Sequence, residues 1–133
     1  MAKKRVATTR GMMPLIGKAA GADGPEAILQ KAIIKTLEGG GWYTKVLHGN
    51  MFQSGLPDLF VAHKSHGQRF IEVKNPLSFS FTQAQLIEFP LITKAGVGIW
   101  ILFGDTDVEI MKLHKPANWW EIWYKWSNGV KNF

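Results

Sequence analysis

The chain of 133 residues contains no cysteine. Disulfide frameworks, zinc sites built from thiolates and cysteine nucleophiles are therefore excluded, and the composition fits a reducing compartment. Long apolar runs are also missing, because the longest, Ala95 to Phe103, is far shorter than the roughly 20 residues that cross a bilayer. The basic amino terminus lacks the apolar run and cleavage site of a secretory signal. We therefore expect a soluble cytoplasmic protein, bacterial or phage-encoded and acting in the host cell.

Acidic residues are absent from the first part of the chain. Five basic residues precede the first acidic residue, Asp23, and the other 11 basic residues nearly balance the 10 acidic ones, so most of the net charge of +6 lies in this segment. The five are Lys3, Lys4, Arg5, Arg10 and Lys18. Glycines and Pro14 interrupt the segment, so we predict a flexible basic arm over residues 1–24 that contacts nucleic-acid phosphates. The alternative is a solvated tail that aids solubility.

Residues 25–133 are expected to form a single domain. Hydrophobic residues make up 46% of the chain, with six Trp and eight Phe, which is enough for one apolar core. Helices are predicted from Pro25 to Gly39, from Thr82 to Lys94 (kinked or divided at Pro90) and in the Trp-rich segment Asn118 to Trp126. Strands are predicted at Trp42–Leu47, Asp58–Ala62, Arg69–Lys74, Val97–Phe103 and Val108–Leu113, with the second and third forming a hairpin and the last two paired. The order indicates an α/β fold with a mixed β-sheet flanked by helices.

The predicted hairpin brings three charged residues together. Asp58 opens one strand and Glu72 and Lys74 close the next, so the antiparallel pairing places them at the same end. Side chains alternate along a strand, so Glu72 and Lys74 face one way and Val73 the other. Two neighbouring carboxylates are costly unless a cation compensates them. Mg²⁺ suits this role, with Asp58, Glu72 and the main-chain carbonyl of Val73 as ligands and Lys74 serving the attacking water or the developing charge, which predicts phosphodiester hydrolysis.

The same residues carry a family resemblance. The segments Gly55-Leu56-Pro57-Asp58, Ile71-Glu72-Val73-Lys74 and Thr82-Gln83-Ala84-Gln85 resemble the signature of PD-(D/E)xK nucleases, in particular the virus-type replication and repair nuclease branch, VRR-NUC. The resemblance covers about residues 25 to 103, and Thr82 stands where Ser is more usual. It implies a restriction-endonuclease-like core, a Mg²⁺ site that also accepts Mn²⁺, metal ligands Asp58 and Glu72, Lys74 serving the water, and Gln85 bracing the site or the phosphate.

Glu26 fits this scheme through the first predicted helix. It falls near the stripe of Leu29, Ile33 and Leu37, so packing of that stripe on the sheet would direct Glu26 to the sheet edge. We predict that Glu26 binds a second or shared metal ion. The alternative is an acidic residue that only stabilises a helix start.

The histidines and the tryptophans give weaker signals. His48, His63, His66 and His114 lack the spacing of zinc sites, so no zinc site is expected. In the loop before Pro57, His48 and Asn50 are candidates for phosphate contact, with an ordinary polar loop as the alternative. The cluster of Trp119, Trp120, Trp123 and Trp126 is expected to seal the core or form a dimer interface rather than to stack bases.

The resulting hypothesis is a metal-dependent DNA endonuclease selective for branched DNA, such as a Holliday junction, in repair or recombination. Junction preference is implied by the resemblance alone, and a homodimer would allow one small domain to cut two strands. A sequence-specific homing or restriction-like endonuclease is the nearer alternative. A non-catalytic nucleic-acid-binding module is the alternative of another class, and the clustered carboxylates argue against it. No nucleotide-binding loop is found, so no nucleotide cofactor is expected.

Overall fold

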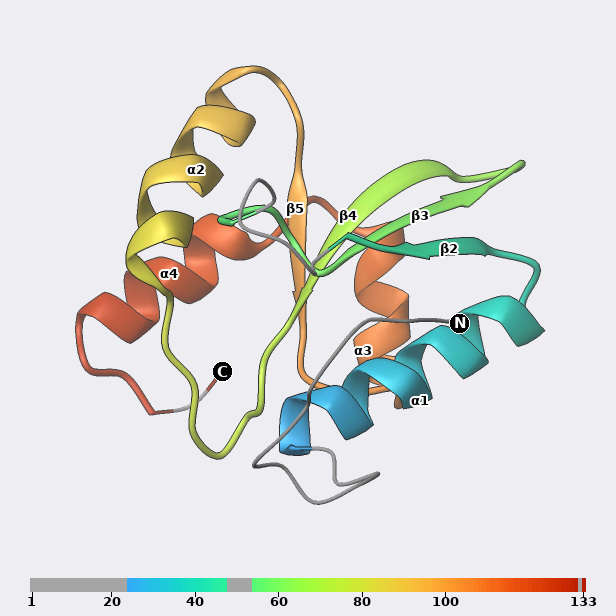
Figure 1. The fold of residues 1–133 in the computed structure, drawn as a ribbon, viewed down its shortest axis with the longest axis horizontal. Coiled ribbons are helices and arrows are strands. Elements are labelled where there is room, and N and C mark those ends of the chain that lie inside the picture. The colour runs from blue at the N-terminus through green and yellow to red at the C-terminus, as the bar shows by residue number, and fades with distance from the viewer. Residues whose placement is uncertain (1–23, 48–53, 132) are drawn as a thin grey trace, which may run out of the picture.

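The structure, a computed structural model, describes residues 24–47, 54–131 and 133. These residues form a four-stranded sheet with helices on both faces (Figure 1). In chain order the elements are α1 (Pro25–Gly39), β2 (Tyr43–Val46), β3 (Leu59–His63), β4 (Gly67–Val73), α2 (Gln83–Lys94), β5 (Ile99–Leu102), α3 (Asp107–Met111), the 3-10 helix η2 (Lys112–His114) and α4 (Trp119–Ser127). The prediction of an α/β fold is confirmed.

The sheet is mixed, as predicted, and its strand order is β2-β3-β4-β5. Strands β2, β3 and β4 are antiparallel neighbours, and β5 runs parallel to β4. Parallel neighbours need a crossover connection, which α2 provides. In the β3–β4 hairpin, Leu59 pairs with Ile71, so the residue before Leu59 lies beside the end of β4. This register places Asp58 next to Glu72 and Val73.

Two apolar clusters cover opposite faces of the sheet. On one face, Ile33 and Leu37 of α1 pack against Leu59, Ile71 and neighbouring residues. On the other face, the second cluster contains Phe89 of α2, Trp119 and Ile122 of α4, and Ile99, Ile101 and Phe103 of the β5 region. Figure 1 shows α1 on one side of the sheet and α2 with α4 on the other. Val73 belongs to the α1 face, so its neighbours Glu72 and Lys74 turn towards α2.

The helices predicted at Pro25–Gly39 and near Thr82–Lys94 are confirmed. Pro25 occupies the first turn of α1, where its missing N–H costs nothing. Pro90 lies inside α2, and the helix continues through it to Lys94 instead of dividing there. The predicted Trp-rich helix is also present, as α4.

The strand predicted at Val108–Leu113 is wrong, because this segment forms α3 and η2. Thr106 caps α3 by accepting a hydrogen bond from the N–H of Glu109, and acidic residues in the first turn favour the helix over the β-branched pattern. At the outer edge of β5, side chains rather than a neighbouring strand form hydrogen bonds with the main chain. Asn118 exchanges two hydrogen bonds with the main chain of Ile101 (2.6 and 3.1 Å), and Glu109 accepts one from the N–H of Phe103 (2.8 Å).

The helices in the described ranges are all too short or too polar to span a bilayer.

Candidate active site

The carboxylate of Asp58 lies at the end of β4. Its Oδ2 accepts a hydrogen bond from the N–H of Val73 at 2.8 Å, so this side chain fixes the position of the strand end that carries Glu72 and Lys74. The preceding residue, Pro57, is buried, so the chain just before β3 is packed inside the domain rather than exposed to solvent. The sequence prediction that the hairpin brings these residues together is confirmed.

Glu72 and Lys74 form a buried ion pair on the α2 side of the sheet. They are only 2% and 3% exposed, and the Nζ of Lys74 lies 3.0 Å from Oε2 of Glu72. The ammonium also lies 5.0 Å from the ring centre of Phe81, whose face attracts a cation. Burying two charges costs several kcal/mol per ion unless further hydrogen bonds satisfy them. The pair therefore depends on its surroundings.

Gln85 supplies those hydrogen bonds. Its Nε2 donates to Oε2 of Glu72 at 2.7 Å, and its Oε1 accepts from Nζ of Lys74 at 3.0 Å. The same Oε1 accepts from the N–H of Thr82 at 3.1 Å, while the Thr82 hydroxyl accepts from the N–H of Gln85, which makes a capping box at the start of α2. The Thr-x-x-Gln helix start is thus both a cap and the brace of the buried ion pair.

One oxygen of Glu72 is left without a partner. Among the described residues, no group donates to its buried Oε1. Burial, together with the negative charge of Asp58, raises the pKa of Glu72 to about 7, although Lys74 and Gln85 act in the opposite direction. An unsatisfied buried polar atom costs about 1–3 kcal/mol, and more when it is charged. The site therefore leaves one buried oxygen of Glu72 uncompensated, next to the carboxylate of Asp58.

Glu26 lies at the exposed edge of this site. Its Oε2 accepts from the N–H of Asn75 at 3.4 Å, so the first turn of α1 contacts the residue that follows Lys74. Glu26 and Asp58 also line one pocket of about 360 Å³, together with Ala27, Gln30 and Lys31. The prediction that α1 directs Glu26 to this edge of the sheet is confirmed.

Sequence reasoning missed Gln30 and Lys31 as pocket residues. Gln30 follows Glu26 by four positions and Lys31 follows Ala27 by four, the spacing of neighbours on one side of a helix. That spacing was visible in the sequence. It became informative only once Glu26 was placed beside Asp58.

The oxygen atoms of the site suit a divalent cation. The orphaned Glu72 oxygen and the crowding with Asp58 both fit an ion held by carboxylates, because hard cations prefer oxygen ligands. No three His, Cys, Asp or Glu side chains in the described ranges come close enough to form a metal-binding group by themselves. An ion here would therefore rely on Asp58 and Glu72, with main-chain, water or phosphate oxygens completing its shell. Metal binding by Glu26 and by the Val73 carbonyl stays a prediction.

Gly55 explains the glycine of the Gly-x-Pro-Asp segment. Its φ is +86°, which L residues with a side chain rarely adopt. A Cβ there would lie 2.6 Å from Cγ of Glu88 and 2.9 Å from the carbonyl oxygen of Ala84, both on α2. Only glycine allows the chain before Asp58 to lie this close to the helix that carries Gln85.

Seven predicted nucleic-acid contacts lie outside the described residues. They are Lys3, Lys4, Arg5, Arg10 and Lys18 of the basic arm, with His48 and Asn50 of the loop before β3. Their roles stay predictions.

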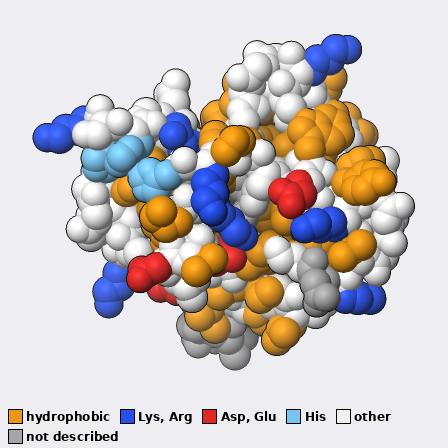
Figure 2. Space-filling view, turned by 180° about the vertical axis from the view of Figure 1, so that it is seen from behind, with side chains coloured by type: hydrophobic (Ala, Val, Ile, Leu, Met, Phe, Trp, Pro, Cys, Tyr) orange, Lys and Arg blue, Asp and Glu red, His pale blue; other side chains and the backbone are white. Residues whose placement is uncertain are grey.

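Three of the four histidines gather at the hairpin turn, which their spacing did not indicate. Ring centres lie 4.6 Å apart for His63 and His66 and 4.5 Å apart for His66 and His114, beside Trp42. Figure 2 shows His side chains together at one end of the face it displays. The Trp-rich helix mainly seals the second core, through buried Trp119 and partly buried Trp123 and Trp126. Its role in a dimer stays a prediction.

Comparisons with known proteins agree with this architecture. No family model matches the sequence, and no curated protein matches it. A solved structure described as a VRR_NUC domain is similar in fold, with a TM-score of 0.56 and 24% sequence identity, over 68% of this chain and 96% of that one. The predicted restriction-endonuclease-like core is confirmed, and the chain has the fold of a VRR_NUC domain.

Proposed function

We propose that the chain is a metal-dependent nuclease that hydrolyses phosphodiester bonds in DNA. One observation carries the proposal: a buried glutamate with an unsatisfied oxygen lies beside a second carboxylate and a buried ammonium, at the strand ends of a VRR_NUC fold. A fold alone does not determine function. The arrangement of these side chains supplies the chemical argument.

Asp58 and Glu72 would hold Mg²⁺, or Mn²⁺ in its place, with the Val73 carbonyl as a third protein ligand and Glu26 near a second or shared ion. When bound, such an ion polarises a phosphoryl oxygen and lowers the pKa of a bound water. Glu72 must release its proton to bind the ion. Its pKa of about 7 makes this release possible near neutral pH.

Lys74 and Gln85 have separate roles in this proposal. Lys74 holds a positive charge beside the carboxylates, where it stabilises negative charge that develops on the phosphate or orients the attacking water. Gln85 is a positioning residue, because both its amide oxygen and its amide nitrogen are already bonded to Lys74, Glu72 and Thr82. Of its two predicted roles, bracing the site agrees with these bonds.

The substrate in this proposal is branched DNA, cut by a homodimer. The preference for branched DNA is supported by the resemblance to VRR-NUC nucleases. The homodimer is supported by the need to cut two strands with a domain that carries one cleavage centre. The basic arm would contact phosphates along the flanking duplex, and His48 and Asn50 would contact the scissile phosphate.

The test is cleavage of synthetic four-way junctions and matched linear duplexes in Mg²⁺ or Mn²⁺, comparing the parent with Asp58→Ala and Glu72→Ala. Glu121→Ala is the matched control, since this glutamate is exposed on α4 and pairs only with Lys125 among the interactions described for it. The parent and the control should cut junctions regardless of sequence, and both site variants should fail. Circular dichroism should show that all four proteins are folded.

Other outcomes support the alternatives. Cutting of one duplex sequence only would indicate a sequence-specific endonuclease. Binding of DNA without cleavage in either metal, or equal cleavage by all variants, would remove the catalytic assignment and favour a binding module.

A further inference from the structure

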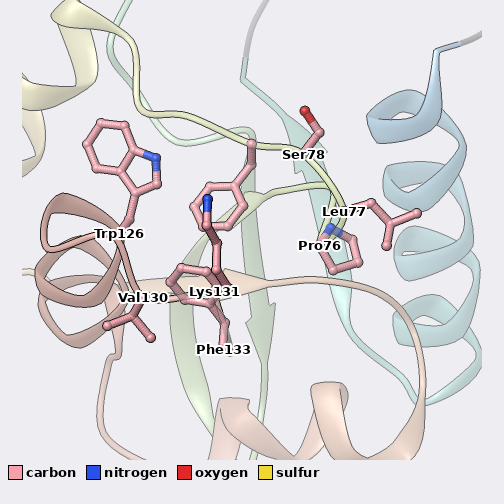
Figure 3. Close-up of a pocket in the computed structure, with 9 residues that line it drawn as sticks. Pro76, Leu77, Ser78, Trp126, Val130, Lys131 and Phe133 are labelled. Carbon is pink, nitrogen blue, oxygen red and sulfur yellow. The ribbon is translucent and has the colours of Figure 1, made fainter.

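A second pocket lies beyond the end of β4, and the proposed function does not use it. Its volume is about 330 Å³, within the range of pockets that hold small ligands. One wall is the turn Pro76 to Phe79, and the other comes from Trp126 of α4 and the segment that follows α4. Figure 3 shows Trp126 facing the Pro76–Ser78 turn across the pocket, with Lys131 and Phe133 between them.

The pocket is close to the candidate active site along the chain. Pro76 follows Lys74 by two residues, a distance of at most about 7 Å even for an extended chain. Phosphates of one DNA strand advance about 3.4 Å per nucleotide along a duplex. Pro76 at the pocket thus lies within about two nucleotide rises of the main chain of Lys74, so neighbouring nucleotides of one strand can contact both.

Aromatic contacts connect the pocket wall to Lys74. The ring of Phe81 lies under the Lys74 ammonium and also packs edge-on against Trp126, with ring centres 5.3 Å apart. Phe79 continues the wall, with ring centres 6.0 Å from Phe81 and 4.9 Å from Phe133. Phe79, Trp126 and Phe133 line the pocket and are only partly buried. Aromatic rings with an accessible face stack nucleobases without regard to sequence, because every base has a π face.

Leu77 stands at the rim of the pocket and is 92% exposed. Its turn is held in place, because its N–H donates to Oδ1 of Asn75 (3.1 Å) and the N–H of Ser78 donates to the Asn75 carbonyl (3.2 Å). A single exposed leucine is common on protein surfaces. Here it stands beside a pocket with three aromatic lining residues, near the candidate active site, and DNA-distorting proteins insert apolar side chains of this kind between base steps.

We propose that this pocket binds one unpaired nucleobase next to the cleaved phosphate, with Leu77 against the base pair left behind and Lys131 against the backbone. The inference rests on the proposed function and gives branch selectivity a physical basis. A nucleotide at a branch point has lost part of its stacking, so its unpairing and entry into the pocket cost less free energy than for a nucleotide within an intact duplex.

The experiment measures the ratio of cleavage rates for branched and linear DNA in the parent, Leu77→Ser and Trp126→Leu. Trp126→Leu should lower this ratio about 10-fold, the size expected for the loss of one stacking contact, and Leu77→Ser should lower it by a similar factor because the exposed base pair loses its apolar partner. Val108→Ser is the matched control, because Val108 is 74% exposed on α3, and it should leave the ratio unchanged. Trp126 also packs against the second core, so the melting temperature of Trp126→Leu is measured first. If Trp126→Leu is unfolded, Leu77→Ser alone tests the inference.

A binding readout separates this inference from the proposed function. In EDTA, 2-aminopurine at the nucleotide beside the branch should lose fluorescence on binding the parent, and the same base placed within the duplex arm should not. An unchanged cleavage ratio in folded variants, or equal fluorescence at both positions, overturns the pocket assignment while cleavage itself stands. If the parent cuts no DNA, the proposed function fails, and the fluorescence alone then supports or refutes the pocket.

Discussion

At one end of the β3–β4 hairpin the charged side chains of Glu72 and Lys74 are buried, whereas at its turn His66 and His114 lie at the surface. Both ends gather titratable groups, and at each end the surroundings shift the pKa of one group, Glu72 or His66, towards its neutral form. Burial and Asp58 raise the pKa of Glu72 to about 7. Desolvation against neighbouring rings, followed by the charges of His114, His63 and Arg69, lowers the pKa of His66 below 6.5.

The two ends of the hairpin differ in what can compensate an unfavourable charge. At the turn, water reaches the exposed rings, so an unfavourable charge is screened by solvent. At the buried end, a specific oxygen of Glu72 has no hydrogen-bond partner among the described residues, and a bound cation or a proton would compensate its charge. A perturbed pKa indicates function most strongly where burial and a specific charge partner occur together. The two ends of this hairpin illustrate that distinction within one molecule.

Of the substitutions that compare the two ends of the hairpin, Lys74→Ala should have the largest effect, because it removes the buried positive charge beside Glu72. Losing this charge should lower the rate of cleavage at saturating DNA by about 10²- to 10³-fold while DNA affinity changes little. His66→Ala, at the other end of the hairpin, should change neither quantity appreciably. Neutralising the basic arm should weaken affinity and its salt dependence more than the rate. Comparable losses of affinity from Lys74→Ala and from the neutralised arm would contradict this separation.

Gln85→Leu tests whether the buried Glu72–Lys74 ion pair depends on its hydrogen bonds to Gln85. The variant leaves Lys74 and Glu72 without two buried hydrogen bonds and removes half of the capping box. The free energy of unfolding should fall by about 1–3 kcal/mol, measured by urea denaturation. Gln68→Leu, at an exposed position of β4, is the control and should change it little. Equal effects of the two substitutions would show that Gln85 does not brace the pair.

Metal affinity should depend on pH through Glu72. Because its pKa is raised to about 7, the proton competes with the ion below that pH, and the affinity for Mn²⁺ should fall about 10-fold per pH unit from 7 to 5. Above pH 7 the affinity should level off. Calorimetric titration of Mn²⁺ at several pH values measures this, and Glu72→Gln should bind weakly with little pH dependence. A parent affinity that is constant from pH 5 to 8 would contradict it.

The smallest expected effect lies at the exposed end. Because the pKa of His66 is lower in the folded protein than its ordinary value of 6.5, the unfolded chain binds the proton more readily. Stability should therefore decrease as the pH falls through 6.5, and His66→Gln should reduce that decrease slightly. The difference in melting temperature between pH 7.5 and 5.5 measures it, with His66 titration by NMR as the direct check. A midpoint above 6.5 would contradict the prediction.

Local patterns predicted the parts of the molecule that depend on local contacts. The apolar stripe of α1, the alternation in the hairpin and the Thr82 cap of α2 each determined their own element. The pairing of Asp58 with Glu72 followed because a hairpin joins neighbours in sequence. The strand predicted at Val108–Leu113 failed because β-branched residues were weighed above the helix start at Thr106.

Long-range contacts could not be read from the sequence. Nothing in its order placed His114 against His66, 48 positions away, or showed that Asn118 would occupy the edge of β5. The same holds for the unsatisfied oxygen of Glu72, which depends on how α2 and the sheet exclude water. The residue types of the site were predictable, but its burial was not.

The shared oxygen of Gln85 has a thermal consequence. Because Oε1 receives both the Thr82 N–H and the Lys74 ammonium, fraying of the first turn of α2 and displacement of that ammonium are one event. The first turn of a helix opens more easily than the centre of a sheet. Heating should therefore abolish cleavage activity at a temperature where the four strands are still paired. Cooling should restore that activity without refolding of the sheet.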